Sequence, residues 1–313
     1  MAGIAVISNP HSRRNLKNPV ISEEMRALLG SDGIVIETQS VAEIPHAIEQ
    51  CLQRGVDILA INGGDGTLHY VTTKLAPMYA EAGRELPLIA LLRGGTMNTI
   101  SKGMKTLSGS PLHILGRIVD KYRRDERFFV AERHALDLNN GEQLGFLFGI
   151  GLPASFLQAY YQGESRGPLK GAYVLGRLVL STPVWGKYAQ RVFHRVRAFV
   201  AAGGEESPYE NYTAIFASTV TEIGLGFELF SRTLEKDGHF LLLGGALSPV
   251  SYVAQLARIY TGETLKGAMF DRVTTDAVIE LEGEYPYMFD GDVKTGITTF
   301  RLRCGPKLRF IQK

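Results

Sequence analysis

Several residue types are scarce in this chain of 313 residues, and each scarcity narrows the class of protein. Only Cys51 and Cys304 are cysteines, and neither belongs to a CxxC motif or a histidine cluster, so the sequence supports neither a disulfide framework nor a structural zinc site. No uninterrupted apolar run reaches the roughly 18 residues of a membrane-spanning helix, and the first residues lack a signal-peptide pattern. We therefore expect a cytoplasmic protein.

The chain also lacks a large net charge of either sign. The 34 Lys and Arg residues nearly balance the 32 Asp and Glu residues, which argues against a nucleic-acid binder that relies on bulk positive charge. The length exceeds what one hydrophobic core usually serves, so two domains are expected. What is abundant is glycine, with 35 residues where an average usage of about 7% gives about 22.

The first third of the chain alternates short apolar runs with amphipathic stretches. Such runs are typical of strands buried on both faces, as in parallel sheets, and the amphipathic stretches predict helices. The alternation predicts an α/β N-terminal domain with an open parallel sheet. The expected strands cover residues 3–7, 33–37, 57–61 and 88–92, and the expected helices cover residues 21–29, 41–54 and 68–81.

After about residue 122 the pattern changes to strand candidates joined by turn signals, which predicts a mainly antiparallel β-sandwich. We place the domains at residues 1–125 and 126–313, with a final strand that can return to the first domain. The expected strands cover residues 134–138, 143–148, 190–201, 212–218, 239–244, 273–282 and 298–304, and the expected helices cover residues 172–180 and 250–260.

Three of the N-terminal strands lead into loops rich in glycine and short polar residues, at residues 8–14, 62–67 and 93–98. In an open parallel sheet such loops meet at the carboxyl edge, where ligands bind. Glycines in the middle loop let backbone amides approach phosphate oxygens. Thr67 can cap the next helix or bind a phosphate, and Asp65 can hold a cation or accept a proton. The plainer alternative is a turn followed by a helix cap.

These loops contain neither GxxxxGK[ST] nor, after the first strand, GxGxxG, so the two commonest nucleotide motifs are absent. The loops instead contain GGDGT at 63–67, NPHS at 9–12 and GTMN at 95–98, and three later segments at 167–173, 234–239 and 289–292 extend the pattern. Together these motifs resemble the diacylglycerol kinase catalytic-domain superfamily, which includes sphingosine and ceramide kinases and has NAD kinases as distant relatives.

The resemblance implies an ATP-dependent lipid kinase. Its reaction would transfer the γ-phosphoryl group to the hydroxyl of a lipid such as diacylglycerol or a sphingoid or ceramide lipid. Asp292 stands where the family has its general base, and Asp65 would organise metal or water. The implied ATP-binding residues are Asn9, Pro10, Ser12, Arg14, Thr38, Gly63, Gly64, Asp65, Gly66, Thr67, Gly95, Thr96 and Asn98.

A structural Mg²⁺ is also implied by the resemblance. Its ligands would be the backbone carbonyls of Leu234 and His239 and the carboxylate of Asp237, and oxygen ligands suit magnesium. Asp137 resembles an aspartate that links this metal site to the GGDGT loop. Lys170 is a candidate supporting residue. Its ammonium would neutralise the charge of a lipid or phosphate group, and the alternative is that it is an ordinary solvated surface lysine.

The sequence departs from the family pattern at several positions. Arg13 replaces a glycine, His69-Tyr70 replaces an Asn-Glu pair, and Thr99 replaces an aspartate. Asp292 replaces a glutamate, so its carboxylate reaches the substrate from a side chain one methylene shorter. Alternative functions at this point are an NAD kinase and a nucleotide- or lipid-binding module that does not catalyse.

Residues 169–200 combine the single tryptophan, Trp185, with six Lys and Arg residues among apolar ones. Such a mixture favours peripheral contact with a membrane that supplies the lipid substrate. The alternation within residues 191–200 fits a half-buried strand with basic residues facing water equally well. A homodimer is compatible with the sequence.

Overall fold

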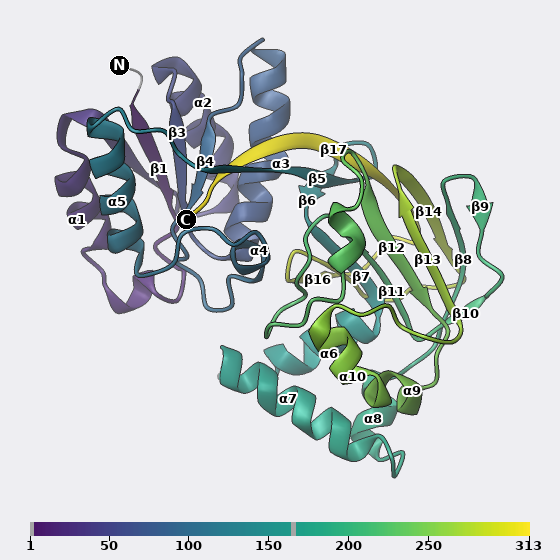
Figure 1. The fold of residues 1–313 in the computed structure, drawn as a ribbon. Coiled ribbons are helices and arrows are strands. Elements are labelled where there is room, and N and C mark those ends of the chain that lie inside the picture. The colour runs from purple at the N-terminus through teal and green to yellow at the C-terminus, as the bar shows by residue number, and fades with distance from the viewer. Residues whose placement is uncertain (1–2, 164–166) are drawn as a thin grey trace. The chain divides into compact units, whose positions relative to one another are not determined.

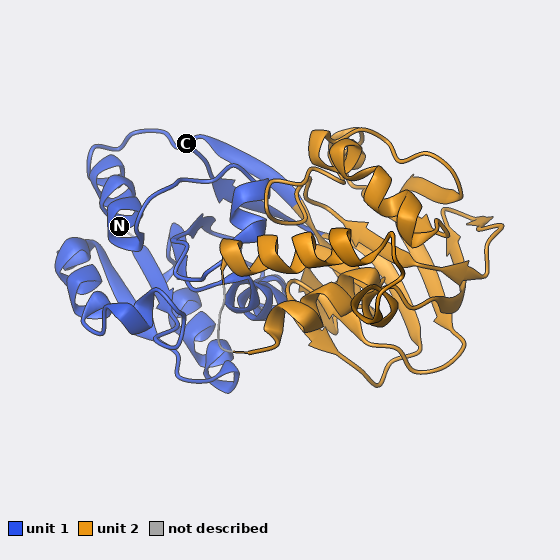
Figure 2. Cartoon of the chain, turned by 90° about the horizontal axis from the view of Figure 1, so that it is seen from below, with its two compact units in different colours: residues 1–133, 306–313 blue, residues 134–305 orange. Residues whose placement is uncertain are grey.

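The computed structural model describes residues 3–163 and 167–313. These residues divide into two compact units, residues 1–133 with 306–313 and residues 134–305, which Figure 2 shows in different colours. The chain passes from the first unit to the second within β5 (Val130–Leu138) and returns within β17 (Thr299–Ile311). The last eight residues therefore belong to the unit in which the chain begins.

Unit 1 is built on a parallel sheet. β1 (Ile4–Ser8) lies between β2 (Gly33–Glu37) and β3 (Ile58–Asn62), and β3 pairs with β4 (Leu88–Leu91), all in parallel register. The end of β17 pairs with β4 in parallel, Phe310 opposite Ile89. The helices are η1 (Asn15–Lys17), α1 (Ile21–Leu29), η2 (Gly30–Asp32), η3 (Val41–Glu43), α2 (Ile44–Arg54), α3 (Asp65–Glu81), α4 (Thr99–Gly103) and α5 (Pro111–Arg123).

Helices cover both faces of this sheet (Figure 1), which explains why its central strands are apolar except for their last residues, Ser8 and Asn62. All five residues of β1 and of β3 are buried. One core cluster joins Ile4 and Val6 of β1 to Met25 of α1 and Ile118 of α5. Because side chains alternate along a strand, Ala5 and Ile7 are buried on the opposite face of the sheet. The polar loops follow the carboxyl ends of these strands.

Unit 2 is mainly antiparallel β-structure. Its six-stranded sheet has the order β13-β12-β11-β7-β15-β16, and in a second sheet β14 lies between β8 and β17. Large aromatic side chains from both sheets, Phe148 and Phe300 among them, form one buried cluster. The strands are β6 (Gln143–Gly145), β7 (Leu147–Gly151), β8 (Val196–Ala202), β9 (Glu205–Glu206), β10 (Asn211–Tyr212), β11 (Ala214–Ser218), β12 (Phe240–Gly245), β13 (Met269–Thr274), β14 (Asp276–Leu281), β15 (Tyr287–Phe289) and β16 (Asp292–Lys294).

The helices of unit 2 other than η4 (Ser231–Leu234) lie along one side of the sheets in Figure 1. In the part of the chain that the structure describes, no helix is long and apolar enough to cross a membrane. Together the parallel α/β unit and the antiparallel unit confirm the predicted fold class. The helices are α6 (Leu152–Tyr161), α7 (Pro168–Ser181), α8 (Lys187–Val192), η4 (Ser231–Leu234), α9 (Pro249–Ala254) and α10 (Leu256–Thr261).

Five predicted elements of unit 2 are wrong in detail. Two of them, the strands expected at 143–148 and 212–218, are each divided between two strands that lie in different sheets. Residues 190–192 belong to α8, because Ala189 and Val192 bury one face of a short helix. Residues 273–282 form two strands in different sheets, and the Thr274 hydroxyl bonds the backbone of Asp276 where the chain changes sheet. The expected helix at 250–260 is interrupted at Gln255, whose side chain bonds the backbone of Lys266.

Candidate functional site

Three loops of unit 1 are bonded to one another at the carboxyl edge of the parallel sheet. The Asn9 side-chain amide donates to the Thr67 hydroxyl at 3.0 Å, which joins the first loop to the second. The backbone N–H of Arg14 donates to the Gly94 carbonyl, and that of Gly95 donates to the Gly63 carbonyl, both at 3.0 Å. The convergence predicted from the sequence is therefore present, and the Thr67 hydroxyl accepts a bond from another loop.

The glycines of these loops allow close approach of one backbone to another. A Cβ atom on Gly95 would lie 2.4 Å from the Cα of Gly64, and one on Gly63 would lie 2.3 Å from the Thr67 Cβ. A Cβ on Gly94 would lie 2.6 Å from the Asn62 side-chain oxygen. Because real Cβ atoms do not approach so closely, loop packing alone requires glycine at all three positions.

Two buried asparagines, Asn15 and Asn62, were not among the residues predicted from the sequence. The Asn15 amide donates to the Asn9 carbonyl at 2.7 Å and to the Asn62 carbonyl at 3.4 Å. Asn62 is fully buried and donates to the Ser8 hydroxyl at 3.0 Å. Together they fix the ends of β1 and β3. A polar residue that ends an apolar strand, as Asn62 does, is the sequence signal for this role.

Asp65 occupies the first turn of α3 and bonds the start of another helix. Its carboxylate accepts the backbone N–H groups of Thr99 at 2.9 Å and Ile100 at 3.2 Å, at the N-terminus of α4. The N-cap residue of α4, Asn98, has a left-handed backbone and directs its own amide to the Arg93 and Gly95 carbonyls. Asp65 thus caps α4 from outside and connects the second loop to the third.

The N-terminus of α3 itself is open to an anion. Its N-cap residue is Gly64, which has no side chain to accept the first N–H groups of the helix. These N–H groups and the helix dipole favour a negative group, and phosphate is a common ligand of such a terminus. GGDGT therefore combines a closely packed glycine loop with the positive end of a helix of 17 residues.

The remaining predicted nucleotide contacts lie around these loops. The backbone N–H of Thr38 bonds the Ser8 carbonyl, and the exposed Arg14 guanidinium bonds the Gly109 carbonyl. His69, one of the departures, is buried, and its ring lies 4.9 Å from that of Tyr70, centroid to centroid. Buried members of the predicted set are Ser12, Thr38, Gly63, Thr67, Gly95 and Asn98, and half-buried members are Asn9, Pro10, Gly64, Asp65, Gly66 and Thr96.

Asp290 and Asp292 occupy different environments in unit 2. Asp290 and Gly291 form the two-residue turn between β15 and β16, both with positive φ, which is the geometry of an Asp-Gly hairpin turn. The Asp290 carboxylate is buried and accepts the backbone N–H groups of Phe146 and Leu147, each at 2.8 Å. Asp290 is therefore structural, and the two carboxylates do not share one face.

We expect Asp290→Ala to lower the free energy of unfolding by about 2 to 4 kcal/mol, because two buried N–H groups lose their acceptor. Asp290→Asn keeps an oxygen acceptor and should cost less. Denaturant unfolding measures both, with the exposed Asp276→Ala as the control, expected within about 0.5 kcal/mol of the unaltered protein. Equal losses in Asp290→Ala and Asp276→Ala would contradict the structural role.

Asp292 is half-buried at the start of β16, and Lys294 follows it on the same face of the strand. The Lys294 ammonium donates to the Gln143 side-chain carbonyl. Burial lowers the pKa of Lys294, while the negative charges of Asp292 and Asp290 act in the opposite direction. Asp292 and Lys294 therefore lie on the same face of β16, and the Gln143 side chain binds the Lys294 ammonium.

The predicted magnesium ligands lie on an exposed turn between η4 and β12. The Asp237 side chain is 75% exposed, and its Oδ1 lies 3.4 Å from the Nε2 of His134, a residue that the sequence did not single out. Nδ1 of His239 lies 2.8 Å from the Asp237 carbonyl. One carboxylate and two backbone carbonyls suit a magnesium ion that keeps several waters, so the donor set fits.

Other predicted supporting residues have local roles in unit 2. The Asp137 carboxylate accepts the Gly141 N–H at 2.6 Å, which closes the turn between β5 and β6. The Lys170 ammonium lies 5.8 Å from the Tyr173 ring centroid on α7. Among the described residues, no group of three or more His, Cys, Asp and Glu side chains could hold a metal ion. A metal at the Asp237 turn would therefore depend on backbone oxygens and water.

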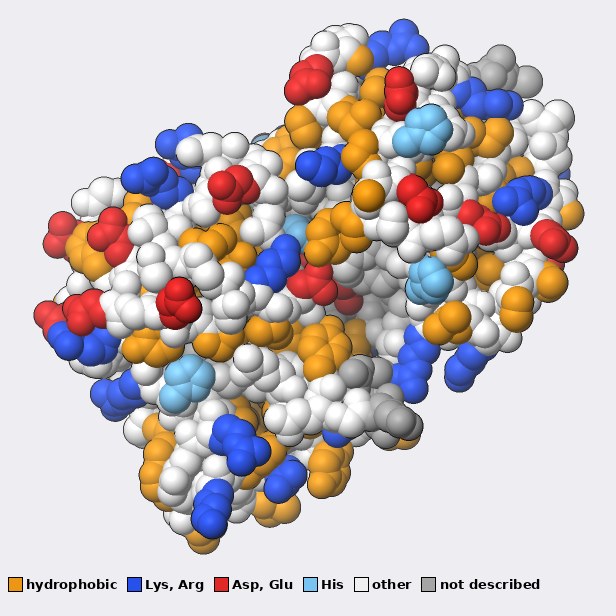
Figure 3. Space-filling view, turned by 180° about the vertical axis from the view of Figure 1, so that it is seen from behind, with side chains coloured by type: hydrophobic (Ala, Val, Ile, Leu, Met, Phe, Trp, Pro, Cys, Tyr) orange, Lys and Arg blue, Asp and Glu red, His pale blue; other side chains and the backbone are white. Residues whose placement is uncertain are grey.

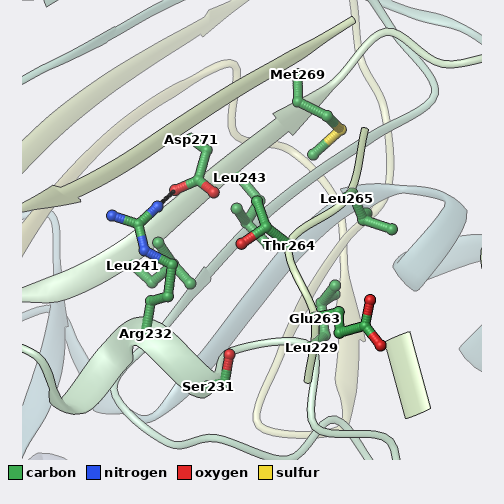
Figure 4. A pocket seen from close by; sticks show the side chains of 10 residues that line it. All are labelled: Leu229, Ser231, Arg232, Leu241, Leu243, Glu263, Thr264, Leu265, Met269 and Asp271. Atoms are coloured by element: carbon green, nitrogen blue, oxygen red, sulfur yellow. Dashed lines mark hydrogen bonds and ion pairs between the residues drawn. The ribbon is translucent and has the colours of Figure 1, made fainter. Parts of the chain in front are cut away.

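A small pocket beside this turn is crossed by an ion pair (Figure 4). The Arg232 guanidinium reaches Asp271 at 2.7 Å and Glu235 at 2.9 Å. Burial raises the pKa of Asp271 more than the attraction of Arg232 lowers it. The remaining space holds about one water molecule. Because Arg232 belongs to η4, the ion pair fixes the helical turn that ends at Leu234.

Comparison with known proteins places these loops in a family. The model of the diacylglycerol kinase catalytic domain matches residues 3–127. No curated protein matches the chain. Two solved structures of a protein named provisionally as a diacylglycerol kinase, from Bacillus anthracis strain Sterne, are similar with TM-scores of 0.72. They are 16% identical and cover all of this chain and 96% or 97% of theirs.

A further structure, of a diacylglycerol kinase from the same strain, has a TM-score of 0.66 at 16% identity and covers 100% of this chain and 97% of its own. At that identity the likeness concerns the fold of the whole chain. The family match concerns the sequence of residues 3–127, which hold all three bonded loops. Residues 3–127 therefore match the diacylglycerol kinase catalytic-domain family, the family that the GGDGT, NPHS and GTMN loops resemble.

Proposed function

We propose that the protein is an ATP-dependent lipid kinase. The observation that carries the proposal is the N-terminus of α3, which presents N–H groups where three loops, two of them rich in glycine, are bonded together inside the family-matched residues. Phosphate binds at helix N-termini of this kind because the helix dipole and the first N–H groups both favour negative charge. The ATP phosphates would bind to the Gly64, Gly66 and Thr67 amides, with Asn9, Ser12, Thr38 and Thr96 around the nucleotide.

In the proposed reaction a lipid hydroxyl attacks the γ-phosphorus of ATP in line with the leaving ADP. The new O–P bond forms as the bond to ADP breaks, and Asp292 accepts the hydroxyl proton. A carboxylate is a weak base, so positioning and electrostatic stabilisation must supply most of the rate. Asp65 contributes by fixing the third loop through Thr99 and Ile100.

The proposal assigns a structural Mg²⁺ to the Leu234 and His239 carbonyls and the Asp237 carboxylate, where it would stabilise the turn. Magnesium bound with ATP neutralises phosphate charge in reactions of this class. The residues of this chain that bind the phosphates are the loop amides, and the one that receives the proton is Asp292. Lys294 holds no phosphate in this scheme and instead supplies a positive charge on the same face of β16 as Asp292.

The decisive assay incubates the purified protein with labelled ATP, Mg²⁺ and a total lipid extract. We expect label in a lipid product and none without protein, and mass spectrometry of that product names the acceptor. A parallel reaction with NAD in place of lipid tests the NAD kinase alternative. Label in NADP and none in lipid would overturn the proposal, and ATP binding without any labelled product would indicate a binding module.

A further inference from the structure

The helix α7 is apolar on two opposite faces. Gly171, Val174 and Leu178 recur at helical spacing and are buried against the rest of unit 2. Leu169, Tyr173 and Leu180 lie on the opposite face, with 87%, 61% and 79% of their surface exposed. A surface helix of a globular protein normally carries polar residues on its outer face. The second apolar face of α7 is therefore exposed and not packed into the core of unit 2.

The corner after α7 continues this surface. Val184 and Trp185 are 77% and 46% exposed. Trp185 has a φ of 46°, a left-handed conformation that is unfavourable for a bulky residue. It is held there by a bond from its N–H to the Thr182 carbonyl and by the Gln190 side chain on its own carbonyl. The strained backbone conformation does not bury the side chain, and Trp185, the only tryptophan of the chain, remains half exposed.

Basic side chains surround these apolar residues, and Figure 3 shows hydrophobic and basic side chains next to one another on this part of the surface. Residues 167–204 contain no Asp or Glu. Within the described part of the chain, none of the four cations beside α7 and the corner pairs with a carboxylate; Arg177 instead stacks on Tyr188 at 4.2 Å. The four are Lys170, Arg177, Lys187 and Arg191.

We propose that the outer face of α7 and the following corner form a docking surface for an anionic lipid bilayer. This docking surface consists of Leu169, Tyr173, Leu180, Val184 and Trp185 with the four cations around them. Aliphatic side chains and tryptophan enter the headgroup boundary, and unpaired cations meet anionic headgroups. The inference rests on the proposed function for its purpose, since a lipid kinase must reach its substrate in a membrane.

A second copy of the chain is a poorer occupant. A two-fold dimer would bring the same surface of each copy together, and with it the same four cations. Like charges so placed repel, and no acidic residue of this segment is present to offset them. A bilayer with anionic headgroups supplies the opposite charge and an apolar layer at once.

The single tryptophan makes the test direct, because all tryptophan emission comes from the proposed surface. We expect Trp185 emission to move to shorter wavelength with vesicles of equimolar phosphatidylcholine and phosphatidylglycerol, and to change much less with phosphatidylcholine alone. Val184→Asp should weaken vesicle binding by about tenfold or more. Lys187→Ala should weaken it by about fivefold, the value of one cation at an anionic surface.

Val250→Asp is the matched control, because Val250 is 55% exposed on α9 of the same unit and should leave vesicle binding unchanged. Circular dichroism and sedimentation without lipid complete the experiment. Three outcomes would each overturn the proposal: unchanged emission with anionic vesicles, equal vesicle binding by Val184→Asp and the unaltered protein, or a lipid-free dimer that Val184→Asp dissociates.

The vesicle assay uses no ATP. Docking without phosphate transfer would therefore leave this inference standing and remove the proposed function, and transfer in detergent without docking would do the reverse.

Discussion

Exchange of Asp292 for asparagine is expected to slow phosphate transfer to lipid by about 10²- to 10⁴-fold, the usual contribution of a positioned general base. Asparagine has nearly the same shape and cannot accept the hydroxyl proton at that oxygen. Asp292 begins β16 directly after the Asp290-Gly291 turn, so the two backbone bonds of Asp290 fix the position of its strand. Initial rates with labelled ATP and lipid measure the effect.

Asp276→Asn is the matched control for Asp292→Asn, because Asp276 is an exposed aspartate on a strand of the same unit. Its rate should equal that of the unaltered protein. Both variants should unfold within about 0.5 kcal/mol of that protein, as surface substitutions usually do. A rate for Asp292→Asn within a few-fold of the unaltered protein would remove Asp292 as the base and leave the kinase assignment intact.

Local pattern was enough to predict the parallel unit. β2 has the predicted bounds, and the fully apolar runs of β1 and β3 are buried on both faces, as the absence of alternation indicated. α5 was missed, although Ser110 and Pro111 carry a start signal: the Ser110 hydroxyl accepts the His113 N–H, and proline occupies the first turn. The helix was not predicted because its apolar content is moderate, although its buried apolar residues recur at helical spacing.

Unit 2 was harder to predict because its pairings connect distant residues. Residues 273–282 form an almost continuous strand pattern, yet β13 pairs with β12 while β14 pairs with β8 and β17. Only the tertiary arrangement of two sheets places the break at Thr274 and Thr275. In the same way, His134 lies next to Asp237 although the two residues are about a hundred positions apart. No spacing rule in the sequence predicts this contact.

The three loops that the sequence placed at one edge of the sheet are bonded to one another, but the predicted reasons for their residues were incomplete. The glycines were expected to let the backbone approach a ligand, and at Gly63, Gly94 and Gly95 the close neighbours are protein atoms. Asp65 was expected to act on metal or water, and its carboxylate also caps α4. Contacts between loops cannot be read from motif spacing, because they depend on how three strand ends lie side by side.

Asp65 therefore has two candidate roles: it caps α4, and its charge can take part in the reaction. Two substitutions distinguish these roles. Asp65→Ala removes the acceptor for the Thr99 and Ile100 N–H groups and should lower the free energy of unfolding by about 1 to 2 kcal/mol. Asp65→Asn should lower it less, because the single amide oxygen of asparagine keeps one of the two bonds that the two carboxylate oxygens accept. If the charge takes part in the reaction, both variants should transfer phosphate at least about 10²-fold more slowly.

Denaturant unfolding and initial rates on the same preparations decide between the roles. Glu23→Gln is the control for loss of a carboxylate in the first turn of a helix, since Glu23 is exposed on α1 and bonds no loop of the site in the described chain. It should change neither measurement. An active, stable Asp65→Asn beside an inactive, destabilised Asp65→Ala would show that Asp65 serves as a cap. An inactive but stable Asp65→Asn requires its negative charge in the reaction, because the cap would then be intact and the loops correctly placed.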